Sequence, residues 1–222
     1  MKKGHAEIYI DVYSDIVCPW CYVGKRRLER ALASVQSDVR VTWRPFQLNP
    51  AMPNDGIDRK TYLEAKFGSL EAFGRLEEQI LAAGEGERIP FAFGKIQRAP
   101  NTFAAHRLIW HAEPQRKQDA MVEVLFRAYF VEGQDIGNVN TLVQMAAEAG
   151  LDQADTEAYL SSEKGVTEVK VEEAAGHRMG IRGVPYFLFN GTYGISGAQP
   201  PERIVAALKD VGADAVVRKA GG

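Results

Sequence analysis

The sequence predicts an α/β protein in which one layer of strands and helices is interrupted by a long helical insertion. A strand, a helix and a second strand follow one another near the start of the chain, helices fill its middle, and a β-hairpin with one more helix closes it. We therefore expect three segments. Residues 1–56 and 181–222 form the two halves of the α/β layer, and residues 57–180 form the inserted helical domain.

The first half carries the pattern of a βαβ unit. Apolar and polar residues alternate from Glu7 to Tyr13, and Leu28, Leu32 and Val35 then recur at helical spacing before a second alternation over 39–44. Two strands joined by one helix in this length are parallel, with a right-handed crossover.

Capping residues and glycines divide the middle of the chain into helices. Ser69 is a good N-cap, while Gly68, Gly84 and Gly150 are placed to end helices. The helices are expected over residues 58–67, 69–83, 101–111, 120–131, 141–149, 155–160 and 163–179.

The pattern returns to strands near the C-terminus. An apolar strand over 185–189 precedes Asn190 and Gly191, the strongest short-range signal for a hairpin turn. We expect the returning strand over 192–196 and a last helix over 200–212, followed by a frayed tail.

Composition narrows the class of protein. The chain has 222 residues and a formal net charge of -2 at pH 7. It therefore has no overall positive field that would recruit nucleic acid. It has no apolar run long enough to span a bilayer. The N-terminus lacks the apolar region of a secretion signal, so we expect a cytoplasmic protein whose thiols are kept reduced.

The two cysteines of the chain, Cys18 and Cys21, stand two residues apart at the junction between the first strand and the first helix, with Pro19 and Trp20 between them. Unpaired N–H groups and the helix dipole stabilise a thiolate at this end of a helix, which lowers a thiol pKa from about 8.5. Proline suits the first helical turn. We expect Cys18 to be an exposed nucleophile of low pKa and Cys21 to be the resolving thiol.

Three other interpretations of this pair are weaker. A zinc site needs two more ligands, and the histidines of the chain are not in a paired spacing: His5, His106, His111 and His177. Inert buried cysteines would rarely fall at this spacing around a proline. A structural disulfide is disfavoured in a reducing compartment. No metal or other cofactor is expected.

Several motifs together resemble the thioredoxin fold, and specifically the DsbA-like group with a helical insertion. Within that group the chain is similar to the FrnE-like cytosolic branch. The motifs that carry the resemblance cover Asp15–Lys25, Trp43–Pro50, Asn101–His106, Ala128–Ile136, Gly183–Phe187 and Ser196–Gln199. The resemblance implies a thioredoxin-like fold with a large all-helical domain inserted between the second strand and the C-terminal hairpin.

The resemblance also implies a substrate-binding surface. Pro185 would form a cis peptide bond and face the dithiol, and Val184 would offer its backbone to an extended substrate. Trp20, next to Pro19, either joins this surface or packs against the helical domain. The remaining candidates each have a structural alternative: His106 a buried hydrogen bond, Gln199 a helix-capping turn, Asn101 a helix cap, and Asp15 a role in organising its turn.

The resemblance implies a thiol–disulfide oxidoreductase that uses its Cys-Pro-Trp-Cys dithiol on protein or small-molecule disulfides, with glutathione as a candidate thiol partner. With tryptophan between the cysteines, no imidazole assists, so a strongly oxidising potential is not expected. The alternative is a glutathione-dependent isomerase or transferase of the 2-hydroxychromene-2-carboxylate isomerase or kappa-class type. Those enzymes typically have serine where Cys18 stands. A non-catalytic binding module is the third hypothesis.

Overall fold

The computed structural model describes the backbone of residues 7–220 and the side chains of residues 7–212. Within that range no helix combines the length and the apolar character that crossing a bilayer requires. His5, one of the four histidines considered above as metal ligands, and residues 221–222 of the expected tail lie outside the described residues.

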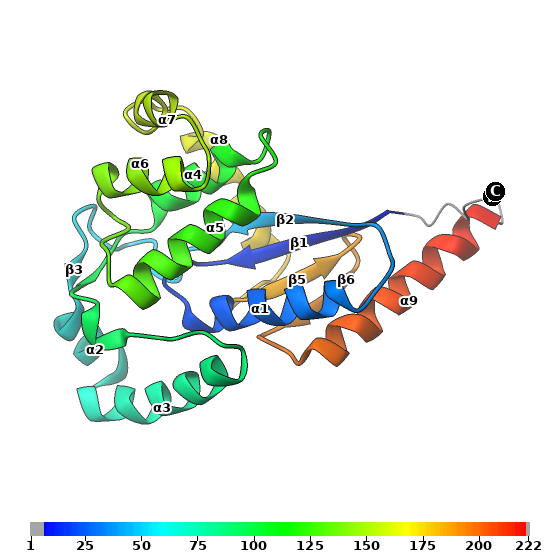
Figure 1. The fold of residues 1–222 in the computed structure, drawn as a ribbon, viewed down its shortest axis with the longest axis horizontal. Helices are drawn as coiled ribbons and strands as arrows, with labels where there is room; N and C mark the ends of the chain where they lie inside the picture. The colour runs from blue at the N-terminus through cyan, green and yellow to red at the C-terminus, as the bar shows by residue number, and fades with distance from the viewer. Residues whose placement is uncertain (1–6, 221–222) are drawn as a thin grey trace.

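A four-stranded sheet forms the centre of the α/β layer (Figure 1). Its strands are β1 (Ile8–Ser14), β2 (Val39–Pro45), β5 (Tyr186–Phe189) and β6 (Tyr193–Ser196), in the order β2-β1-β5-β6. β1 and β2 are parallel, as the βαβ pattern predicts, whereas β5 is antiparallel to both of its neighbours. Tyr13 pairs with Tyr186, so the strand that leads to Cys18 lies beside the strand that follows Pro185.

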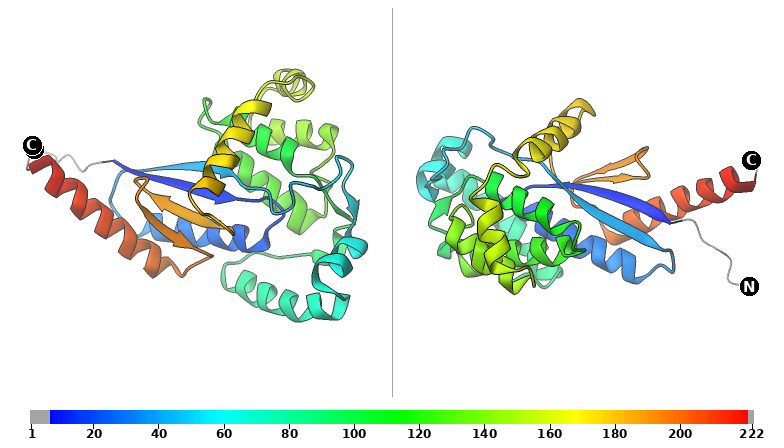
Figure 2. Two further views of the ribbon diagram at one scale, coloured as in Figure 1. Left: turned by 180° about the vertical axis from the view of Figure 1, so that it is seen from behind. Right: turned by 90° about the horizontal axis from the view of Figure 1, so that it is seen from above.

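Helices cover both faces of this sheet. Helix α1 (Pro19–Ala33) and helix α9 (Pro201–Ala220) lie side by side on one face, and α8 (Val166–Arg178) crosses the other (Figures 1 and 2). The α9 helix continues through Gly212, so the prediction that it ends there is wrong. A glycine inside a helix costs only about 1 kcal/mol relative to alanine, and Gly212 keeps a negative φ.

The inserted segment lies at the end of the sheet where α1 begins (Figure 1). Besides α8, its regular elements are β3 (Ile57–Asp58), α2 (Arg59–Phe67), α3 (Leu70–Gly86), η1 (Phe93–Lys95), β4 (Arg98–Ala99), α4 (Phe103–Ala112), α5 (Gln118–Arg127), η2 (Ala128–Glu132), α6 (Val139–Glu148) and α7 (Gln153–Leu160). Caps start several of them: Asp58 accepts a hydrogen bond from the Thr61 N–H, and Ser69 accepts one from the Ala72 N–H.

Two features of the insertion differ from the sequence prediction. Helix α3 runs past Gly84, because this glycine leaves the space that the ring of Phe91 occupies rather than ending the helix. The chain that follows, between the helices expected over 69–83 and 101–111, was predicted to have no regular element, but it contains the 3-10 turn η1 and the strand β4. Ala99 in β4 pairs with Ile57 of β3. Because α2 begins directly after β3, this pairing holds the start of α2 beside β4.

Candidate active site

The dithiol lies where the first strand gives way to the first helix. Cys18 is the N-cap residue of α1, Pro19 occupies its first turn, and the Cys21 N–H donates to the Cys18 carbonyl over 2.9 Å. The Cys18 N–H donates to the Asp15 carbonyl, which fixes the turn between strand and helix. Both cysteines are free thiols.

Both thiols are more enclosed than the sequence suggests. Cys18 is 5% exposed and Cys21 is 1% exposed, so the expectation of an exposed nucleophile is wrong. The reason is tertiary packing: the Cys18 thiol donates a long hydrogen bond of 3.6 Å to the carbonyl oxygen of Val184, which comes from the far end of the chain. Cys18 is reached through a cavity that its side chain helps to line.

The two thiols are electrostatically unequal. The hydrogen bond from the Cys21 thiol lowers the pKa of Cys18 most, and the N–H groups of Cys21 and Trp20 lower it further, against the opposing effects of burial and of the Asp15 carboxylate. Burial raises the pKa of Cys21 well above its usual value. The first turn of the helix therefore favours a thiolate on Cys18 and a neutral thiol on Cys21, as the position of the pair predicts.

Ser14 is a member of this site that sequence reasoning missed. Its hydroxyl is buried and, among the side chains described, is left without a hydrogen-bond partner. It is close enough to Cys21 to lower the pKa of that thiol, partly offsetting the effect of burial. A neutral thiol is a weak acceptor, so this hydroxyl gains a strong partner only when Cys21 ionises.

Asp15 and His106 form a buried polar pair behind the dithiol. Oδ2 of Asp15 accepts the Leu48 N–H over 2.7 Å, and its Oδ1 lies 3.3 Å from Nε2 of His106. His106 is buried in α4 and is not among the residues that line the cavity. Asn101 accepts the Phe103 N–H at the start of the same helix, in keeping with a capping role.

The C-terminal half of the layer contributes the residues beside Cys18. The peptide bond between Val184 and Pro185 is cis. Gly24 of α1 lies so close to Pro185 that a Cβ atom there would come within 2.9 Å of the proline ring. The Gln199 amide donates to the Ser196 carbonyl over 3.0 Å within its own turn, and this side chain is not part of the cavity wall.

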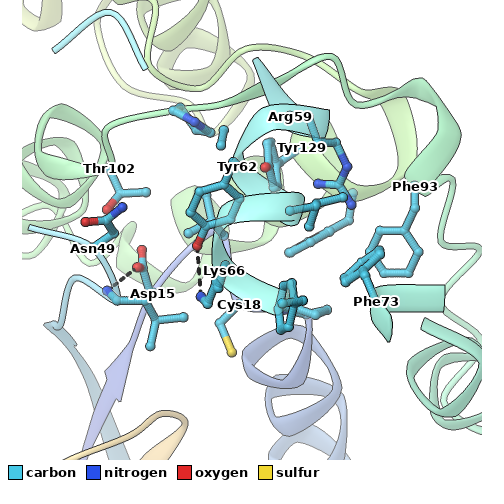
Figure 3. Close-up of a pocket in the computed structure, with 18 of the residues that line it drawn as sticks. Asp15, Cys18, Asn49, Arg59, Tyr62, Lys66, Phe73, Phe93, Thr102 and Tyr129 are labelled. Atoms are coloured by element: carbon cyan, nitrogen blue, oxygen red, sulfur yellow. Dashed lines mark hydrogen bonds between the residues drawn. The ribbon is translucent and has the colours of Figure 1, made fainter. Parts of the chain in front are cut away.

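A cavity of about 240 Å³ opens beside Cys18, between the dithiol and the inserted helices (Figure 3). Most of its walls are apolar or aromatic. They are formed by Asp15, Val17, Cys18, Pro19, Trp20, Leu48, Asn49, Met52, Arg59, Tyr62, Leu63, Lys66, Phe67, Phe73, Leu76, Ile80, Phe93, Ala99, Pro100, Thr102, Tyr129 and Phe130. Trp20 lines this cavity and is also packed, partly buried, against the hydrophobic core.

The family model of the DsbA-like thioredoxin domain matches residues 9–209 of this sequence. The chain belongs to the DsbA-like thioredoxin family. Its fold is the one predicted, with the helical insertion between β2 and the β5-β6 hairpin. Cys18 and Cys21 form the CxxC pair of a DsbA-like oxidoreductase.

The chain is similar to several individual proteins. A probable DsbA oxidoreductase from Streptomyces coelicolor is 33% identical, with a TM-score of 0.84 over 91% of this chain and 89% of that one. The uncharacterized protein YwbO of Bacillus subtilis is 31% identical over 91% of this chain and 96% of its own length. A 2-hydroxychromene-2-carboxylate isomerase shares the fold, with a TM-score of 0.69 at 14% identity, over 96% of this chain and 100% of that one.

The motifs that resemble the DsbA-like group do not include the residues in the cavity wall opposite Cys18. Arg59, Tyr62 and Lys66 come from α2, and Tyr129 comes from the π-helical turn η2 that follows α5. Their spacing in the sequence is that of ordinary amphipathic helices, and no local pattern associates them with a cysteine far away along the chain.

Proposed function

We propose that this protein is a thiol–disulfide oxidoreductase of the FrnE-like branch that acts on protein or small-molecule disulfides. The observation that carries the proposal is the pair of unequal thiols in one helical turn. The pKa of Cys18 is lowered, while that of Cys21 is raised by burial. In such a pair, one cysteine is the nucleophile, and the other stays protonated until it resolves the mixed disulfide.

The reaction proceeds by two sulfur exchanges. The Cys18 thiolate attacks one sulfur of the substrate disulfide, forms a mixed disulfide, and releases the other sulfur as a thiolate. Cys21 loses its proton and attacks the Cys18 sulfur, which forms the Cys18–Cys21 disulfide and releases the second substrate thiolate. Two electrons pass from the protein to the substrate, and the reverse sequence oxidises a dithiol.

Backbone groups beside Cys18 are proposed to hold the substrate. Val184 would pair with an extended segment of a protein substrate, and Pro185 presents no N–H to the thiolate. Trp20 and Pro19 would form the apolar side of the entrance, with Gln199 at its rim and His106 acting through Asp15. In a cytoplasmic setting glutathione is the proposed thiol partner, and reduction or isomerisation of disulfides would prevail over oxidation.

A trapping experiment tests this proposal. The Cys21→Ser variant has a nucleophile but no resolving thiol, so incubation with oxidised insulin is expected to leave a covalent mixed disulfide at Cys18. Non-reducing electrophoresis and peptide mass mapping measure it. Wild-type protein under the same conditions should show no lasting adduct. Absence of the Cys18 adduct in the variant would refute the exchange mechanism.

A further inference from the structure

Helix α2 contributes two cations to the wall of the cavity opposite Cys18. Arg59 and Lys66 lie on α2, and both line the cavity together with Tyr62 (Figure 3). The Arg59 guanidinium lies 5.6 Å from the ring centroids of both Phe73 and Phe93. Aromatic faces therefore hold this guanidinium at the edge of the cavity.

Lys66 is held in a similar way. Its Nζ donates to the Tyr62 hydroxyl over 2.8 Å and lies 5.2 Å from the ring centroid of the same tyrosine. Figure 3 shows the Lys66 ammonium and the Tyr62 hydroxyl pointing toward each other, and both residues line the cavity. Lys60 and Lys66 are both exposed on α2, but only Lys66 lines the cavity.

Among the residues that the structure describes, no carboxylate forms an ion pair with either of these cations. Across residues 7–212, ion pairs connect many arginines and lysines to carboxylates, but none involves Arg59 or Lys66. The carboxylate in the cavity wall, Asp15, is buried and already accepts the Leu48 N–H. The cavity thus has aromatic walls, a reactive sulfur and two cations that no described carboxylate pairs with.

The size of the cavity limits what it can hold. A dry protein cavity of roughly 150 Å³ binds benzene, so about 240 Å³ suits one or two fused rings with small substituents. An anionic substituent would find partners in Arg59 and Lys66, and guanidinium binds carboxylates through paired hydrogen bonds.

We propose that this cavity binds small aromatic disulfides and thiols that carry a carboxylate, with the ring against the aromatic walls and the carboxylate at Arg59 and Lys66. The proposal rests on the proposed function, because the substrate sulfur must meet Cys18. In the first exchange, Cys18 forms a disulfide with one aromatic sulfur and the other aromatic half leaves as a thiolate. Cys21 then attacks the Cys18 sulfur and releases the second aromatic half as a thiolate. The dithiol thereby supplies the two electrons that reduce the aromatic disulfide.

Two reagents separate the contribution of the carboxylate from that of the ring. Dithiobis(nitrobenzoate) is an aromatic disulfide with a carboxylate on each ring, and dithiodipyridine is an aromatic disulfide without one. Stopped-flow absorbance follows the reaction of each with the pre-reduced full-length protein. We expect Arg59→Gln and Lys66→Gln each to slow the carboxylate reagent about tenfold, the factor for one lost charge-assisted hydrogen bond. Dithiodipyridine should react at the wild-type rate.

Lys60→Gln is the matched control, because it removes the same charge from the same helix outside the cavity. It should change either rate by less than about twofold, as expected for a screened surface charge. Equal slowing of both reagents, or equal effects of Lys60→Gln and Lys66→Gln, would overturn the assignment of this site while Cys18 remained reactive. If Cys18 in the wild-type protein reacts with both reagents only as fast as a small free thiol, the proposed function fails as well.

Discussion

Cys18→Ser is expected to abolish disulfide reduction. A serine hydroxyl keeps its proton near neutral pH and receives no thiolate stabilisation from the Cys21 thiol or the N–H groups of the first helical turn. Loss of the nucleophile in other enzymes that act through covalent intermediates costs several orders of magnitude, so we expect turnover to fall at least about 10³-fold. Insulin reduction coupled to a thiol reductant measures this loss.

The control for Cys18→Ser is thermal unfolding of the same variant. Serine is close to cysteine in size and would still face the Val184 carbonyl, so the melting temperature should stay near that of the wild-type protein. Turnover above about one tenth of the wild-type rate in a folded Cys18→Ser protein would contradict nucleophilic catalysis by this residue.

Lys25→Ala is expected to lower the free energy of unfolding substantially. Lys25 is 2% exposed, one turn beyond Cys21, and its ammonium pairs with Glu29 and with two carboxylates of α5, Asp119 at 3.2 Å and Glu123 at 3.1 Å. Its removal leaves three carboxylates close together and a cavity where the side chain packed. Breaking a buried ion pair costs about 3–5 kcal/mol. The carboxylates are partly exposed, so we expect about 2–4 kcal/mol.

Lys25→Met separates charge from packing, because it keeps most of the apolar stem. In urea titrations near neutral pH, we expect Lys25→Met to lose less free energy of unfolding than Lys25→Ala does.

The stability that this cluster provides depends on pH. Burial opposes ionisation of Glu123, but Lys25 and Arg26 lower its pKa overall. Its stabilising contribution is therefore complete above the ordinary glutamate pKa of about 4.3 and is lost as the pH falls through the lowered folded value. The difference between Lys25→Ala and wild type should shrink over that acidic range. A loss below about 1 kcal/mol at neutral pH would contradict a structural role for this cluster.

The sequence predicted the parts of the site that depend on local structure. Cys18 and Cys21 lie in the first turn of α1 because the alternation of β1 and the helical spacing that follows are both local signals. Asp58 and Ser69 start helices for the same reason, since each side chain bonds an N–H three residues away.

Features that depend on distant segments were not predictable in this way. The burial of Cys18 comes from Val184, more than 160 residues away along the chain. The cation-bearing wall of the cavity requires α2 to lie opposite the dithiol, which no spacing in the sequence specifies. The interpretation of Gly84 as a helix stop was wrong because of packing rather than sequence distance: the ring of Phe91, seven residues later, occupies the space that a side chain at Gly84 would need.

Cys18 ionises more easily than an ordinary thiol, whereas Cys21 does not. The most direct test is the rate of alkylation of the reduced wild-type protein by iodoacetamide as a function of pH, with mass mapping of the modified residue. We predict one modified residue, Cys18, with a reaction midpoint below the ordinary thiol pKa of about 8.5 and no reaction of Cys21 in that range. A midpoint at or above that value, or equal modification of both cysteines, would contradict the account.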